Sequence, residues 1–299
     1  MNEYRFWQVD AFSRHPYLGN PAAIVFAADE ISDDQMQIIA RQFNLSETVF
    51  LCEPTSPDAD YLARIFTPTS ELPFAGHPTI ASAFSVYSDL SVEARERATL
   101  LRQECGVGII PITIELLEGA PLFTLTAGEY SARDAGLGAD IPARMLGVAE
   151  SDISEVPAEV CSGGLPWLII ALKSLAAVSG ALPDQALIAK ICDERKAIGL
   201  TIYSEGAKTD GCDYHLRSFV PGLGINEDPV CGSGSIAVAI HLARHARAGE
   251  EAFSFQAEQG LEIGRRGVLH LTVDGNDGDS PGIRLGGHAA KTMEGVFWV

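Results

Sequence analysis

An internal repeat constrains the fold of this chain more than any other feature of its sequence. Residues 71–83 align without a gap to residues 227–239, with identical residues at six of thirteen positions. Residues 64–68 and 217–221 share an Arg, a Phe and a Pro at the same spacing. Two shorter matches lie upstream, Asp34-Gln35 with Asp184-Gln185 and Gly19-Asn20-Pro21 with Gly164-Leu165-Pro166. The four matches keep their order along the chain, which predicts two copies of one structural unit.

The repeat predicts two similar domains, each running turn, strand, helix, strand, loop and buried helix. We expect the division to follow a strand predicted over residues 122–126. The first domain then comprises residues 1–128 together with a C-terminal strand at about 288–299, and the second comprises residues 129–287. We expect the two copies to face each other across a cleft that holds the active site.

The predicted secondary structure is mixed. Alternating or β-branched residues predict strands over residues 61–66, 108–117, 122–126, 214–219 and 268–273. Start signals predict helices over 32–43 and 183–192. Two further helices, 78–87 and 235–243, contain no Asp, Glu, Lys or Arg, and a helix that is apolar on every face is buried. We therefore predict an α+β fold in which each domain is a curved mixed β-sheet wrapped around a buried central helix.

Length and charge limit the classes of function. The chain has 299 residues, a formal net charge of −19 and 46% hydrophobic residues, which is typical of a folded globular protein. The excess of acidic residues argues against nucleic acid and anionic membranes as partners, because both would be repelled. The first residues lack the apolar core of a secretion signal, and the six cysteines are scattered without a CxxC pair. We therefore expect a reduced, cytoplasmic protein.

Gly76 and Gly232 lie in short loops directly before the two predicted buried helices. A helix start exposes unpaired N–H groups and the positive end of the helix dipole, and glycine lets a ligand approach closely. Such loops can hold a carboxylate or an enolate-like charge without a metal, so we expect neither metal nor cofactor. His241 and His245 are one helical turn apart, but no third ligand stands beside them in the sequence, so this metal motif is weak.

Three segments carry a resemblance to a known family. They are residues 44–48 (NLSET), 71–78 (ELPFAGHP) and 227–234 (EDPVCGSG), with Gly19-Asn20-Pro21 near the start. Together they resemble the signature blocks of the phenazine-biosynthesis PhzF-like isomerase family, and the resemblance covers nearly the whole chain. That family is similar in fold to diaminopimelate epimerase, in which two domains also face each other around buried helices. The resemblance further implies a homodimer.

The resemblance implies a cofactor-independent isomerase that moves a proton between carbon atoms, as in the family's namesake reaction on dihydro-hydroxyanthranilate. It maps the acid/base onto Glu47 and supporting positions onto His77, Asp228 and Ser233. The residue types suit the reaction, because proton transfer at carbon needs one group that acts first as base and then as acid. His77 and Asp228 can hold the substrate's substituents and pass protons.

The expected substrate is a small carboxylated molecule. Ser233 and the backbone N–H groups of Gly76 and Gly232 are suited to bind its carboxylate. Asn20 is first of all a turn residue, and we also place it in the substrate-binding set with Cys231.

Cys231 leaves a second reaction open. The family's namesake enzyme resembles this chain here but has Thr, whereas diaminopimelate epimerase has one catalytic Cys in this loop and another in its other domain. The internal repeat places Ala75 opposite Cys231, so the chain has one of the two thiols. One alternative is therefore a two-base racemase or epimerase using Glu47 and Cys231, which a lowered thiol pKa at the helix start would suit. A small buried filler is the simpler interpretation of Cys231.

Two further functions are open. A non-catalytic small-ligand-binding protein would have the same fold without proton transfer, and Glu47 and His77 argue against it. A cysteine hydrolase using Cys231 and His77 ranks lower, because no third orienting residue is evident.

Overall fold

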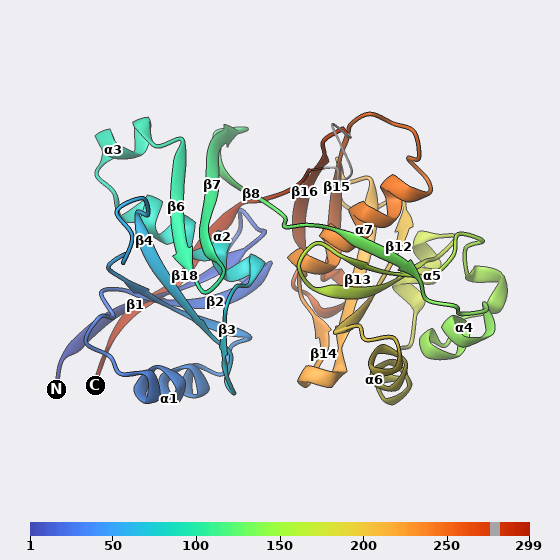
Figure 1. The fold of residues 1–299 in the computed structure, drawn as a ribbon, viewed down its shortest axis with the longest axis horizontal. Coiled ribbons are helices and arrows are strands. Elements are labelled where there is room, and N and C mark those ends of the chain that lie inside the picture. The colour runs from blue at the N-terminus through green and yellow to red at the C-terminus, as the bar shows by residue number, and fades with distance from the viewer. Residues whose placement is uncertain (276–281) are drawn as a thin grey trace. The chain divides into compact units, whose positions relative to one another are not determined.

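The computed structural model describes residues 1–275 and 282–299 and has an α+β fold dominated by β-strands (Figure 1). It divides into two compact units. Unit 1 comprises Met1–Leu125 with Gly286–Val299, and unit 2 comprises Thr126–Leu285. In the described residues, no helix is long and apolar enough to cross a membrane.

Unit 1 is a mixed sheet with three helices among its described residues. Its elements are β1 (Glu3–Ala11), β2 (Asn20–Val25), α1 (Asp33–Phe43), β3 (Glu47–Cys52), β4 (Tyr61–Phe66), β5 (Glu71–Leu72), α2 (Gly76–Asp89), α3 (Val92–Arg97), β6 (Leu100–Cys105), β7 (Gly108–Leu117), β8 (Ala120–Thr126) and β18 (Ala289–Trp298). The C-terminal strand β18 pairs antiparallel with β1.

Unit 2 adds further helices to a sheet of the same kind. Its elements are β9 (Ser131–Asp134), α4 (Asp140–Leu146), η1 (Glu150–Asp152), β10 (Glu159–Ser162), β11 (Pro166–Ala171), α5 (Leu175–Gly180), α6 (Gln185–Glu194), β12 (Gly199–Glu205), β13 (Tyr214–Val220), η2 (Pro221–Leu223), β14 (Ile225–Asp228), α7 (Gly232–Arg244), β15 (Phe253–Gln259), η3 (Leu261–Ile263), β16 (Gly267–Val273) and β17 (Ile283–Gly287).

The two units share one order of strand pairings. In unit 1, the pairs β1–β2, β3–β4 and β6–β7 are antiparallel, whereas β2–β3 and β4–β6 are parallel. In unit 2, the pairs β10–β11, β12–β13 and β15–β16 are antiparallel, whereas β11–β12 and β13–β15 are parallel. Each strand of one series thus has a counterpart in the other, which is the pattern of a duplicated unit.

Each unit has one arginine–glutamate bridge at the corresponding place in its sheet. Arg64 in β4 donates two hydrogen bonds of 2.8 Å to Glu71 in β5. Arg217 in β13 donates bonds of 2.9 and 2.8 Å to Glu227 in β14. The side chain of Arg217 is 7% exposed, compared with 24% for Arg64. The same bridge is therefore buried in unit 2 and partly hydrated in unit 1.

Capping residues set the helix boundaries. Ser32 caps α1 in a reciprocal capping box with Gln35. The helix predicted to open at Pro183 instead begins after Asp184, whose side chain accepts the N–H of Leu187. The predicted central helices also begin earlier, at Gly76 and Gly232. In α2 this puts Pro78 in the first turn, where its missing N–H costs no helical hydrogen bond.

The two central helices, α2 and α7, lie against the sheets of their own units, as Figure 1 shows. In α7, every residue from Gly234 to Leu242 is buried. The close approach requires Gly234, because a Cβ there would lie 2.5 Å from Thr201 Oγ1 on β12. The burial predicted from the apolar composition of these helices is confirmed for α7 and for the first half of α2, whereas Phe84, Val86 and Tyr87 in the second half of α2 are partly exposed.

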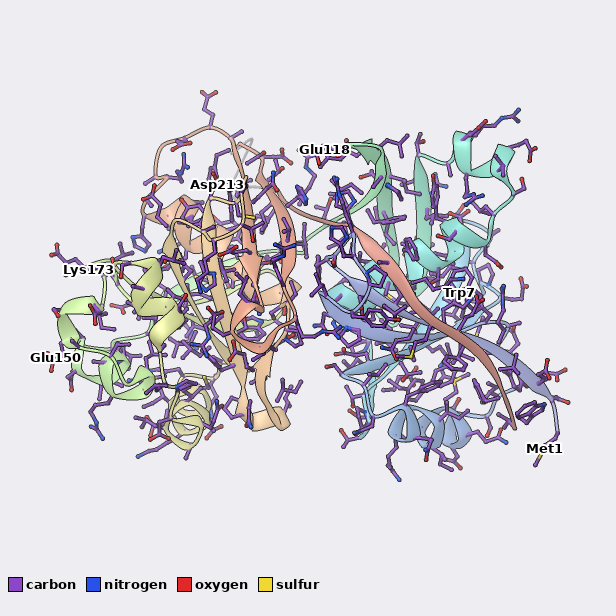
Figure 2. The ribbon with its side chains drawn as sticks, turned by 180° about the vertical axis from the view of Figure 1, so that it is seen from behind. Met1, Trp7, Glu118, Glu150, Lys173 and Asp213 are labelled. Atoms are coloured by element: carbon purple, nitrogen blue, oxygen red, sulfur yellow. The ribbon has the colours of Figure 1, made fainter. Side chains whose placement is uncertain are left out.

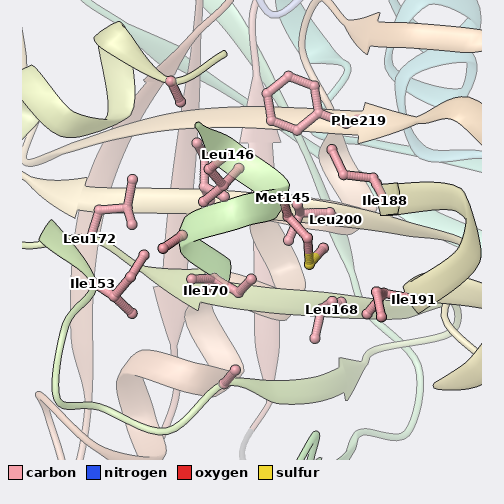
Figure 3. Packing of buried hydrophobic residues seen from close by; sticks show 14 of the residues in the cluster. Met145, Leu146, Ile153, Leu168, Ile170, Leu172, Ile188, Ile191, Leu200 and Phe219 are labelled. Atoms are coloured by element: carbon pink, nitrogen blue, oxygen red, sulfur yellow. The ribbon is translucent and has the colours of Figure 1, made fainter. Parts of the chain in front are cut away.

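Alternation along β11 and β12 divides their side chains between the two faces of the sheet. Leu168, Ile170 and Leu200 belong to a buried cluster with residues of α4 and α6 (Figure 3). Trp167 and Thr201 instead contact α7 on the other face. Burying each aliphatic side chain stabilises the fold by roughly 1.5–3 kcal/mol. This cluster therefore holds the paired strands β11 and β12, against which α7 packs, in position.

Candidate active site

Glu47 and His77 form a close acid–base pair in unit 1. Glu47 is the first residue of β3, and His77 is the second residue of α2. The Oε2 atom of Glu47 lies 3.1 Å from Nε2 of His77, and their side chains are 14% and 9% exposed. Two titratable groups in contact and largely shielded from water are suited to exchange a proton.

Burial keeps the imidazole of His77 neutral. Desolvation lowers the pKa of His77 to about 3, and a hydrogen bond to the backbone of Pro21 opposes that shift in part. Proline has no N–H, so the imidazole must donate this bond to the carbonyl oxygen of Pro21. Because Nε2 faces Glu47, the nitrogen that donates is Nδ1, and the Nε2 lone pair of the neutral ring points toward the carboxyl group.

The lowered pKa of His77 predicts a loss of stability in acid. The unfolded chain binds a proton at this position below about pH 6.5 and the folded chain does not, so the free energy of unfolding falls as the pH drops toward 4. We expect His77→Asn to flatten this dependence by up to about 1.4 kcal/mol per pH unit. Urea unfolding between pH 7 and 4 measures the slope, with the exposed His15→Asn as control. Equal slopes in the wild type and His77→Asn would contradict the prediction.

The remaining predicted residues of unit 1 lie close to this pair in the chain. Asn20 is fully buried at the first position of β2, next to Pro21, which His77 contacts. Gly76 is the first residue of α2, and the N-cap residue Ala75 makes no side-chain capping bond. The positive end of the α2 dipole is thus not shielded by a capping side chain, which favours an anion there.

Asp228, Cys231, Gly232 and Ser233 come together at the start of α7 in unit 2. Cys231 is the N-cap residue, and its Sγ accepts the N–H of Gly234 at 3.3 Å. The Oγ atom of Ser233 lies 3.7 Å from the same sulfur. The thiol therefore accepts the backbone N–H that a Ser or Thr hydroxyl accepts at the start of many other helices.

The expectation of a lowered thiol pKa at this helix start is wrong. Burial raises the pKa of Cys231 well above its ordinary value, and the neighbouring carboxylate of Asp228 raises it further. The N–H of Gly234 and the hydroxyl of Ser233 lower the pKa, but desolvation outweighs them. Cys231 is consequently a neutral thiol rather than a ready base.

We expect Cys231→Ser to leave any catalytic activity that depends on Glu47 within about threefold of the wild type. A hydroxyl is a stronger N-cap acceptor than a thiol, so stability should stay equal or rise by up to about 1 kcal/mol. Steady-state kinetics and thermal unfolding measure the two effects. A loss of activity of a hundredfold or more, with the fold intact, would instead support catalysis by the thiol.

Two buried glutamines tie the central helices to their sheets, although neither is among the residues predicted for the site. Gln259 accepts the N–H of Cys231 at 3.2 Å and donates to the carbonyl of Asp228 at 2.8 Å. In unit 1, Gln103 on β6 donates to Thr79 Oγ1 in α2 at 3.0 Å. Gln259 thereby fixes both ends of the loop that carries the candidate residues of unit 2.

In the described part of the chain, one group of side chains has the spacing of a metal site. Glu159 joins His241 and His245, with ligand atoms within 4.8 Å of one another. Both ring nitrogens of His241 already have partners at 2.8 Å, Tyr203 and the carbonyl of Pro157. The guanidinium of Arg244 occupies both oxygens of Glu159. These bonds would have to break before a cation could bind, so the group is suited to an internal ion pair.

Comparison with known proteins identifies the family of this chain. The family model PhzC-PhzF, described as phenazine biosynthesis-like protein, matches residues 9–295. The chain belongs to this family.

Named relatives of this PhzF-like chain include isomerases. The antisense-enhancing sequence 1 protein of Schizosaccharomyces pombe is 33% identical, with all of both chains covered. The trans-2,3-dihydro-3-hydroxyanthranilate isomerase of Pseudomonas chlororaphis is 34% identical, with 97% of each chain covered. Its counterpart in Pseudomonas aeruginosa is 31% identical, with 98% of each covered. These similarities place the PhzF-like chain among the isomerases.

Solved structures agree on the fold. A PhzF-family protein of Bacillus anthracis superposes with a TM-score of 0.91 at 25% identity, covering 100% of both chains. A hydroxyproline epimerase of Agrobacterium vitis superposes with a TM-score of 0.66 at 14% identity, covering 99% of this chain and 91% of its own. The predicted diaminopimelate epimerase-like α+β class is confirmed.

Proposed function

We propose that the protein is a cofactor-independent isomerase that moves a proton between carbon atoms of a small carboxylated substrate, with Glu47 as the proton carrier. The observation that carries the proposal is the contact of 3.1 Å between Glu47 and His77. Both side chains are largely shielded, and both are positioned by regular structure rather than by a mobile loop.

In the proposed reaction, Glu47 removes a proton from a carbon next to an unsaturated or carbonyl group. The electron pair moves into the conjugated system, and Glu47 then delivers the proton to another carbon of the same system. The negative charge that develops in between is favoured near the start of α2, where no side chain caps the helix. The Nε2 lone pair of the neutral His77 can accept a hydrogen bond from Glu47 while the carboxyl group carries the proton, and the low pKa of His77 keeps the proton on Glu47.

We propose that Asp228 and Ser233 bind the substrate in the same reaction, with Asn20 and the backbone N–H groups of Gly76 and Gly232. Ser233 is partly exposed and offers a hydroxyl, so it is suited to a carboxylate. Asp228 is also partly exposed and is suited to an amino or hydroxyl substituent. The substrate named for two relatives, trans-2,3-dihydro-3-hydroxyanthranilate, has all three substituents.

The two-base racemase or epimerase is the second candidate. It needs Cys231 as a thiolate, and burial and Asp228 both raise the pKa of that thiol. The high pKa weighs against this reaction, because forming the thiolate would carry a large energetic cost at neutral pH.

Further properties belong to the same proposal. We propose a cytoplasmic homodimer that acts on a small molecule and has neither a nucleic acid nor a membrane as its partner. Light scattering of the purified chain gives its mass in solution, and a mass near 32 kDa would contradict the dimer.

Deuterium incorporation tests the proposed reaction. The protein is incubated in D2O with trans-2,3-dihydro-3-hydroxyanthranilate and a panel of amino and hydroxy acids, and mass spectrometry follows deuterium entering carbon positions. We expect incorporation with the wild type and its loss with Glu47→Gln. Incorporation that is equally fast in both proteins would overturn the role of Glu47.

A further inference from the structure

Trp167 occupies the strand position in unit 2 that corresponds to Ala22 in unit 1, the residue paired with Glu47. In the parallel ladder of unit 1, Glu47 on β3 is registered with Ala22 on β2. In the parallel ladder of unit 2, Gly199 on β12 is registered with Trp167 on β11. Unit 1 thus pairs a small residue with a carboxylate, whereas unit 2 pairs a large ring with a glycine.

The ring of Trp167 requires the glycine beside it. A Cβ at position 199 would lie 2.7 Å from a ring carbon of Trp167 and 2.6 Å from the carbonyl oxygen of Phe219. Any side chain at Gly199 would therefore displace the indole or the neighbouring strand. Unit 2 has no room for a carboxylate where unit 1 has Glu47.

Both side chains act on the same position of a central helix. Glu47 contacts His77, the second residue of α2, and Trp167 contacts Ser233, the second residue of α7. The indole Nε1–H of Trp167 donates to Ser233 Oγ at 3.0 Å. An indole N–H donates only, and it neither ionises nor accepts a proton at neutral pH. Unit 2 therefore also has a side chain that contacts the second residue of the central helix, but this side chain is not an acid.

The hydrogen bond from the indole of Trp167 limits the directions in which the Ser233 hydroxyl can donate its own hydrogen. With one lone pair of Oγ occupied by Trp167, the hydroxyl hydrogen turns toward another acceptor. Within the loop the neighbouring group is Cys231 Sγ, 3.7 Å away, where either atom can be the donor, and this sulfur already receives the N–H of Gly234. Trp167 is 2% exposed and Cys231 is 4% exposed, whereas Ser233 is partly exposed. Ser233 is thus the member of this chain of bonds that a ligand can reach.

We propose that Trp167 is a positioning residue that holds the Ser233 hydroxyl as a hydrogen-bond donor to the carboxylate of the substrate. The proposal rests on the proposed function for the identity of the substrate class. A carboxylate oxygen is a stronger acceptor than a neutral thiol, so a bound carboxylate receives the hydroxyl hydrogen in preference to Cys231. Trp167 thereby selects for an anion without contacting it.

Binding of two matched probes tests the proposal without any turnover. Anthranilate carries a carboxylate, and anthranilamide has a neutral amide in its place. We expect the wild type to prefer anthranilate, and Trp167→Phe to reduce that preference about five- to tenfold by calorimetry. Trp167→Phe keeps an aromatic ring and removes the donor. Trp7→Phe, at a buried tryptophan of unit 1 labelled in Figure 2, is the matched control and should leave the preference unchanged.

A double-mutant cycle separates positioning from packing. If Trp167 acts through Ser233, Trp167→Phe has no further effect on anthranilate affinity in a Ser233→Ala background. Effects that add would overturn the proposal, as would an equal loss of affinity for anthranilamide. A wild type without preference for anthranilate would overturn it too.

The indole signal gives a readout that does not depend on ligand binding. The chain has three tryptophans, so Trp167→Phe identifies the Trp167 N–H peak in a nitrogen-15 spectrum. We expect Ser233→Ala to shift this peak and to leave the other two unchanged. An unmoved peak would overturn the bond to Ser233. Deuterium incorporation by the wild type and Glu47→Gln remains a separate measurement, so failure of the isomerase proposal is distinguishable.

Discussion

Glu47→Gln is expected to slow deuterium incorporation into the substrate by about 10²–10⁴-fold, the usual contribution of a general acid–base. The amide has nearly the shape of the carboxyl group, so substrate affinity should change little. The side chain of Glu47 is 14% exposed and 3.1 Å from His77, and an amide there cannot take up the proton. Mass spectrometry of the labelled product and the steady-state kcat measure the loss.

Two further variants make this result specific. Glu47→Asp keeps the acid but retracts it by one methylene, and a misplacement of about 1 Å costs roughly a hundredfold in rate. Glu71→Gln removes a glutamate whose side chain is 42% exposed on β5, and it should keep the wild-type rate within twofold. A fall in rate with Glu71→Gln that matches the fall with Glu47→Gln would point to loss of structure rather than loss of the base.

Arg217→Met is expected to lower the free energy of unfolding by about 3–5 kcal/mol. The guanidinium bridges Glu227 through two bonds and also donates to the carbonyls of Val178 and Ala181. Methionine fills most of the volume but leaves the carboxylate of Glu227, 11% exposed, without its counter-ion. Chemical unfolding followed by fluorescence gives the difference.

The duplicated bridge of unit 1 supplies the control. Arg64 and Glu71 have the same bidentate geometry, with side chains 24% and 42% exposed. Arg64→Met should therefore cost no more than about 1 kcal/mol. Adding Glu227→Gln to Arg217→Met removes the unpaired charge and should restore part of the loss. Equal losses at positions 64 and 217 would show that burial does not decide the strength of this bridge.

Much of the fold could be predicted because hydrophobic pattern and sequence repeat report on burial directly. The apolar helices at 78–87 and 235–243 form the cores of α2 and α7, and the strand predicted over 61–66 is β4. Helix starts were less predictable. Cys231 caps α7 through a sulfur atom, and no capping preference identifies cysteine in this position.

The residues of the candidate site that act as acids or bases could be predicted from the sequence. Glu47 and His77 were named from the family resemblance, and the structure brings them into contact. Trp167 and Gln259 are not among the predicted site residues, because an indole and an amide have no acid–base role that a sequence pattern would mark. The repeat held a signal for Trp167, since the alignment sets this large ring against Ala22. Only the ladder register shows that its neighbour, Gly199, stands where the other copy has its acid.

The absence of a carboxylate at Gly199 has a stereochemical consequence for the proposed reaction. A racemase needs one group to take the proton and a second to return it from the opposite side of the carbon. With Glu47 as the proton carrier and a neutral thiol at Cys231, the proton returns to the molecular face from which it left. Product formed in D2O should then carry its deuterium on that single face, and chiral centres elsewhere in the substrate should keep their configuration.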